Sequence, residues 1–283
     1  MDWVPLLFFD DVCHQLRKPE FNQVVQLSGS WPSFGSEHHK KRRELKFVCQ
    51  VNDQAVNYSL WGTDWGYREE TVADLNLEFD RITYFAWASA LPNNHRVSLR
   101  EFERVVLPTV ASLVTNCSWW YRAPKRSAQN RIFFNAFKNW PGFNSISVAE
   151  QGQESRDFVA RQVELGNVQT LYLSGTDKWP EAENLTETLK NFVSSTNFHS
   201  FNSRDLLLNH FDLFELFLER ALANELKQGA RISAPSTNLN KNRLLALRRE
   251  CRDYLTIDEW EIPDSNLRIA LRYCTGLLEL EVE

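Results

Sequence analysis

The sequence predicts an α/β protein, α+β overall, in which a three-helix N-terminal module and a β-hairpin connector precede an irregular solenoid of strand–helix repeats. Three observations predict this fold class. Apolar residues recur at helical spacing near the N-terminus, they alternate from Glu44 onward, and strand-like runs alternate with helical patterns after Phe143. We place the boundaries at 1–44 for the module, 45–97 for the β-rich connector, and 98–283 for a helix followed by the repeats.

The N-terminal module begins with a helix whose first turn contains Pro5, where the missing N–H of proline is not needed. Its apolar stripe comprises Leu6, Phe9, Cys13 and Leu16, with Val12 beside it. Pro19 starts a second short apolar helix, and Trp31 opens a third segment that ends in a basic run. Three short helices in about 40 residues bury little surface alone, so the module needs something to pack against.

A β-hairpin and then a longer helix follow the module. Segments 44–51 and 55–62 alternate apolar and polar residues on either side of a polar turn at 52–54, which predicts a hairpin. Ser98 and Glu101 form an S-x-x-E capping box, which predicts the start of a helix.

Strand-like runs recur in the second half at intervals of roughly 20 to 32 residues, the period of a leucine-rich-repeat-like solenoid. They begin at Phe143, Val168, Phe198, Ala230, Thr256 and Leu277. A helical pattern lies between each pair, and the last one comprises Leu267, Ala270, Leu271 and Cys274. One strand–helix unit cannot cover its own apolar face, so we expect neighbouring units to stack into a parallel sheet backed by helices. An ordinary α/β domain is the alternative.

The composition excludes a disordered protein and a membrane-spanning one. An apolar content of 43% with 10 Trp and 19 Phe in 283 residues is enough for packed cores. No apolar run is long enough to span a membrane. The net charge of −5 gives no overall attraction to nucleic acid or anionic lipid. The five cysteines lack CxxC or Cys/His spacing, which predicts neither a disulfide framework nor a zinc site and favours the cytosol or nucleus.

The sequence has none of the common catalytic motifs, and it therefore predicts no enzyme, no cofactor and no metal. Asp10 and Asp11 are neighbours on a helix and face different ways, so we do not expect a paired acid/base site. His38 belongs to a charged run, and His14 is part of no recognisable catalytic motif. An enzyme with an unrecognised site is a further alternative, and it predicts polar residues that converge in a deep pocket at the strand ends.

A basic segment with aromatic residues gives single-stranded nucleic-acid binding as an alternative function. Trp119, Arg122, Lys125 and Arg126 combine a stacking surface with positive charge, which is how single strands are held. The acidic net charge argues against this function, and a core position is the other interpretation of Trp119.

The order of Val4 and Pro5, an apolar stripe through Val12 and Leu16, a second apolar helix and then Trp31 resembles an F-box, in the style of the large nematode F-box families. The resemblance covers about the first 45 residues. It implies a surface that binds a Skp-type adaptor of a cullin–RING ubiquitin ligase. It also implies that Trp31 packs between the three helices and stabilises their arrangement. By resemblance this surface comprises Pro5, Leu6, Phe9, Val12 and Leu16.

The resemblance implies a non-catalytic substrate-recognition subunit of an SCF-type ligase. The module would hold the adaptor and the repeats would hold a target protein, with no cofactor and no membrane contact. A different possibility is an interaction scaffold without ligase ties, in which residues 1–45 are simply the first helices of one domain.

Overall fold

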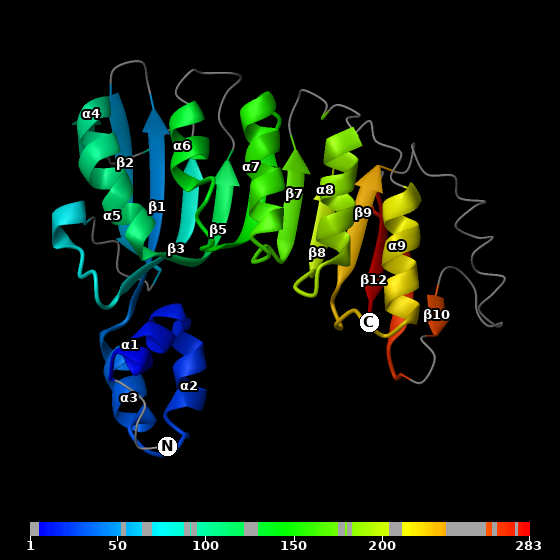
Figure 1. Ribbon diagram of the computed structural model, residues 1–283, viewed down its shortest axis with the longest axis horizontal. Coiled ribbons are helices and arrows are strands. Elements are labelled where there is room, and N and C mark those ends of the chain that lie inside the picture. Colours follow the sequence, from blue (N-terminus) through cyan, green and yellow to red (C-terminus); the bar gives the residue numbers. More distant parts are fainter. Residues whose placement is uncertain are drawn as a thin grey trace. The chain divides into compact units, whose positions relative to one another are not determined.

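The computed structural model (Figure 1) describes residues 6–51, 55–63, 70–87, 91, 95–121, 130–174, 179, 183–203, 211–235, 259–261, 265–274 and 277–283. The chain divides into two compact units, Met1–Ala136 and Phe137–Glu283. The boundaries expected after residues 44 and 97 both fall inside the first unit. Within the ranges above, no helix has the length and apolar character needed to cross a membrane.

Three helices open the first unit: α1 (Leu6–Gln15), α2 (Phe21–Val24) and α3 (Trp31–Lys41), with a short 3-10 turn, η1 (Lys18–Glu20), before α2. Pro19 and Pro32 lie in the first turns of η1 and α3, where a helix has no use for their N–H. Gly29 has a φ of 74° between α2 and α3, a left-handed conformation that glycine adopts without strain. Residues 6–41 are called the helical module below.

Hydrogen bonds join the helical module to the sheet of the same unit. Arg81 Nε donates to the carbonyl of His14 at 3.2 Å. Asn116 Nδ2 donates to the carbonyl of Gln15 at 2.8 Å, and Arg17 Nη2 donates to the carbonyl of Asn116 at 3.2 Å. These contacts involve the C-terminal end of α1 and the residues just after it, so the module belongs to the first unit and is not a separate domain.

Within its described residues, the first unit forms a mixed sheet with the strand order β5-β3-β1-β2-β4. The strands are β1 (Arg43–Val51), β2 (Ala55–Gly62), β3 (Asp80–Trp87), β4 (His95–Ser98) and β5 (Val114–Tyr121). β1 and β2 form the antiparallel hairpin that their alternation predicts, and β3 and β5 run parallel to β1. The hairpin therefore forms part of a sheet and is not a connector.

Short helices accompany this sheet. η2 (Val72–Asp74) precedes β3, and α6 (Asn130–Phe137) follows β5. Between β4 and β5 lie α4 (Leu99–Glu101), the π-helical turn η3 (Phe102–Val106) and α5 (Leu107–Leu113). Ser98 Oγ accepts a hydrogen bond from the backbone N of Glu101 at 3.2 Å, as the capping pattern predicts.

The second unit contains a mixed sheet with the order β10-β11-β12-β9-β8-β7-β6 among its described residues. β6 (Phe143–Ala149), β7 (Thr170–Ser174), β8 (Ser200–Ser203) and β9 (Arg231–Pro235) are parallel, and α7 (Gln153–Glu164), α8 (Glu183–Ser194) and α9 (Phe211–Leu222) connect them. β12 (Leu277–Val282), β11 (Arg268–Cys274) and β10 (Glu259–Glu261) extend the sheet as antiparallel neighbours. Figure 1 shows α7, α8 and α9 on one face of this sheet.

The predicted fold class, a three-helix N-terminal module and a β-hairpin connector followed by an irregular leucine-rich-repeat-like solenoid, is wrong. A solenoid of strand–helix repeats has parallel strands, whereas β9, β12, β11 and β10 pair antiparallel, and so do β1, β2 and β4. The last predicted helix, with Leu267, Ala270, Leu271 and Cys274, is mostly strand β11. Ile269, Ala270 and Leu271 are all buried there, and β11 pairs antiparallel with β12, which decides for a strand.

Candidate functional site

A small apolar core holds the helical module together. Cys13 and Phe21 are fully buried, Val24 is nearly so, and three partly buried side chains pack against them: Leu16, Trp31 and Phe34. The ring of Phe9 stacks on Phe34 with centroids 5.3 Å apart, and it meets Trp31 edge-on at 4.4 Å. The apolar stripe of α1 therefore faces α3 and the interior of the module.

In this packing, the residues predicted to face an adaptor differ in how far they are buried. Phe9 is only 4% exposed, so it is a core residue and does not form a binding surface. Val12 and Leu16 are half-buried, and Leu16 packs on the module's core. Pro5 lies outside the described residues, as does the side chain of Leu6.

Phe8, which sequence reasoning missed, is the exposed aromatic residue of α1, at 49%. Its ring lies against Trp31 with centroids 6.2 Å apart. The apolar stripe of α1 fills the core, so an apolar residue just outside the stripe has to lie at the surface. The position of Phe8 beside the stripe was therefore the signal in the sequence.

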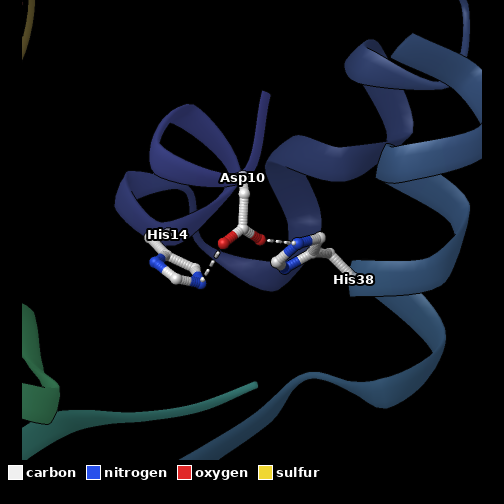
Figure 2. Close-up of side chains that lie close together, drawn as sticks. All are labelled: Asp10, His14 and His38. Atoms are coloured by element: carbon white, nitrogen blue, oxygen red, sulfur yellow. Dashed lines mark hydrogen bonds and ion pairs between the residues drawn. The ribbon is translucent and has the colours of Figure 1, made fainter. Parts of the chain in front are cut away.

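A cluster of one carboxylate and two imidazoles lies between α1 and α3. Figure 2 shows Asp10 between the rings of His14 and His38. Asp10 Oδ1 is 2.8 Å from His38 Nε2, and Asp10 Oδ2 is 3.4 Å from His14 Nε2. The two rings are 5.6 Å apart and nearly perpendicular. His38 is 2% exposed, and Phe21 stacks on its ring at 6.0 Å.

Two buried arginines border this cluster and influence its charge. Arg42 Nη2 donates to the carbonyl of Cys13 at 2.5 Å and lies 3.4 Å from His38 Nδ1. Burial lowers the pKa of both arginines, that of Arg81 to about 10.

Both imidazoles favour the neutral form. Burial, followed by the charge of Arg81, lowers the pKa of His14. Burial also lowers the pKa of His38, against the hydrogen bond to Asp10, which raises it.

The cluster was not found from the sequence, although one part of it left a signal. Asp10 and His14 are four residues apart, which places them on one face of a helix. His38 comes from another helix, and only the fold brings it to Asp10. Carboxylate and imidazole side chains in this arrangement can share protons or coordinate a metal ion.

A charged network joins the starts of strands β1 and β3. Asp80 is fully buried at the start of β3 and accepts two hydrogen bonds from Arg43, from Nε at 2.7 Å and Nη2 at 2.5 Å. The backbone N of Asn76 donates to the same carboxylate at 2.7 Å, and Arg43 Nη1 also pairs with Glu70 at 2.7 Å. This network ties β1 to β3 and is structural.

The first aromatic residue of the segment considered for nucleic-acid binding is not accessible to a ligand. Trp119 is fully buried in β5, with its ring 5.3 Å from Phe85 and parallel to Phe134 at 6.4 Å. It therefore cannot stack on a nucleic-acid base, because a base must reach the face of the ring. Arg122, Lys125 and Arg126 lie outside the described residues.

Polar residues gather at the end of β6, a strand end at which an enzyme could place its catalytic residues. Glu150 is buried and accepts hydrogen bonds from Arg156 at 2.8 Å and from the backbone N of Gly152 at 3.1 Å. Ser155 Oγ donates to the carbonyl of Gly152 at 2.8 Å. These bonds hold the first turn of α7, and they give the group a structural role.

Comparison with known proteins gives no family. No family model matches the chain, and no curated protein matches it. Among solved structures, the chain is similar to the MycE methyltransferase of the mycinamycin pathway in complex with Mg, SAH and mycinamycin VI. The identity is 10% and the TM-score 0.26, over 98% of this chain and 93% of that one. That structure is of a methyltransferase, whereas the sequence predicts no enzyme. At this TM-score the likeness carries no argument about a reaction.

Proposed function

We propose that the helical module binds a Skp-type adaptor, and that the chain is a substrate-recognition subunit of a cullin–RING ubiquitin ligase. The observation that carries this proposal is the exposed ring of Phe8, which lies on Trp31 at the surface of the module. The F-box resemblance of the same segment, with Pro5 before the helix and Trp31 after it, supports the proposal.

The two ends of α1 differ in their contacts, and the exposed aromatic ring lies near the N-terminal end. The C-terminal end, at His14 and Gln15, is hydrogen-bonded to the sheet, whereas Phe8 lies near the N-terminal end. Burying a phenylalanine side chain contributes about 1.5–3 kcal/mol, and aromatic residues are common anchors of protein interfaces. Phe8 beside Trp31 therefore supplies a compact apolar anchor.

The remaining parts of the proposal concern the target and the compartment. The target protein would be held by the sheet-bearing parts of the chain. The complex would work in the cytoplasm or nucleus, where thiols stay reduced, in agreement with the free, buried Cys13, Cys49 and Cys117.

The test is co-purification of the full chain with a recombinant Skp-type adaptor. Phe8→Asp places a charge at the exposed anchor, and Val105→Asp is the matched control, because Val105 is 53% exposed on η3. We expect the parent and Val105→Asp to bind equally and Phe8→Asp to bind at least about tenfold more weakly. Circular dichroism verifies that all three are folded. Equal binding by the parent and Phe8→Asp, or no binding by the folded parent, contradicts the proposal.

A further inference from the structure

We propose that Asp10, His14 and His38 bind a divalent transition-metal ion, of which Zn²⁺ is the probe, and that this ion links α1 to α3. Two imidazoles and one carboxylate are donors that zinc and its neighbours in the first transition row accept. Asp10 and His14 come from α1 and His38 from α3. The metal would therefore join two helices that already meet through the small core of the module and the Asp10–His38 hydrogen bond.

The spacing of the donor atoms is close to that of a metal site. The three ligand atoms all lie within 4.8 Å of one another. Ligands at about 2.0–2.2 Å from a zinc ion stand roughly 3.4 Å from each other at tetrahedral angles. Asp10 Oδ1 is 2.8 Å from His38 Nε2, which is closer than this value, and Asp10 Oδ2 is 3.4 Å from His14 Nε2, which matches it. Donors as far as 4.8 Å apart have to approach one another to share one ion, and rotation of the two imidazole rings would provide that movement.

His14 supplies an independent observation. Its Nε2 atom is buried, and among the described residues it has no hydrogen-bond partner, because its contact with Asp10 lacks hydrogen-bond geometry. A buried nitrogen without a partner costs free energy, and proteins rarely keep one. A metal ion between the rings uses the lone pair of this atom and removes the cost.

The neighbouring arginines lower the affinity of the site for a metal ion but still allow binding. A ring that binds metal through Nε2 keeps its proton on Nδ1, so the 3.4 Å contact between Arg42 and His38 Nδ1 has to open. Arg42 retains its bond to the carbonyl of Cys13. Because Arg42 and Arg81 repel a cation, we expect a Kd for Zn²⁺ in the micromolar range, about 1–10 µM, and not the tight binding of a dedicated zinc finger.

The test is a zinc titration of the full chain after treatment with a chelator, read by calorimetry. His14→Ala and Asp10→Asn remove ligands, whereas His39→Ala and Asp11→Asn are matched controls on the same helices. We expect one Zn²⁺ per chain for the parent and both controls, and binding at least about tenfold weaker in the two ligand variants. Zinc should also raise the melting temperature of the parent but not of His14→Ala.

Cobalt substitution distinguishes this cluster from the cysteines and does not depend on a variant folding. Co²⁺ at Asp10, His14 and His38 gives visible d–d bands without the charge-transfer absorption of a thiolate ligand. A parent that binds no Zn²⁺ at about 100 µM overturns the proposal. It is equally overturned by thiolate absorption on Co²⁺ binding, or by unchanged zinc binding in folded His14→Ala.

Discussion

Gly35 in α3 gives the sharpest test of how the helical module is packed. A Cβ atom at this position would lie 2.7 Å from Val24 Cγ1 and 3.2 Å from Val24 Cβ. Carbon atoms attract best at about 3.5–4.0 Å. Val24 is 7% exposed and β-branched, so it has few ways to move aside. We expect Gly35→Ala to cost about 1–3 kcal/mol through overpacking, offset by about 1 kcal/mol of gained helix propensity.

A double-mutant cycle with Val24→Ala isolates this contact. Val24→Ala alone leaves a cavity, but in the double variant the new methyl group of Gly35→Ala occupies part of it. We therefore expect a favourable coupling of about 1–2 kcal/mol between the two changes. Hydrogen exchange of the amides of α2 and α3 measures the opening of the module separately from the rest of the chain. Ser36→Ala, on the exposed face of α3, controls for helix propensity. Additivity within about 0.5 kcal/mol refutes the close approach of the two helices.

Two further predictions concern the first sheet. Asp80→Ala removes the acceptor of Arg43 at the start of β3 and should cost about 3 kcal/mol in urea unfolding, whereas Glu37→Ala, which breaks an exposed pair, should change little. Similar midpoints for the two variants contradict a structural role of the network. Burial raises the pKa of Tyr58 above its unfolded value of about 10. Above that pH the unfolded chain loses this proton first, so stability falls as the pH rises toward the folded pKa, and Tyr58→Phe should reduce the loss measured between about pH 8.5 and 10.5. If the pH dependence of stability is the same in Tyr58→Phe as in the parent, this prediction is contradicted.

Local patterns predicted local elements well. The alternation in 44–51 and 55–62 predicted the β1–β2 hairpin, because successive side chains of a strand point to opposite faces and the two runs are adjacent in sequence. The Ser98 cap was predicted because its hydrogen bond depends on residues only three positions apart. These features need no knowledge of the rest of the chain.

Arrangement in space was not predictable in the same way. β11 contains Ala270 and Leu271 side by side, which fits a helical stripe as well as a strand, and only pairing with β12 decides between them. The direction of that pairing, and therefore the mixed sheet, depends on neighbours far apart in sequence.

The candidate site shows the same limit. The spacing of Asp10 and His14 was visible in the sequence, but His38 joins them only because α3 packs on α1. Phe9 was expected at the surface, because the sequence shows which residues share a stripe but not which stripe the core takes. The exposed Phe8 follows once Phe9 is placed between Trp31 and Phe34.

The affinity of the full chain for a purified Skp-type adaptor tests the central claim most directly. Isothermal titration calorimetry on the parent chain gives both stoichiometry and Kd. The account predicts a one-to-one complex with a Kd of about 1 µM or tighter, as expected when an aromatic anchor on a preformed helical surface is buried. The absence of any complex at about 50 µM of folded chain and folded adaptor contradicts it.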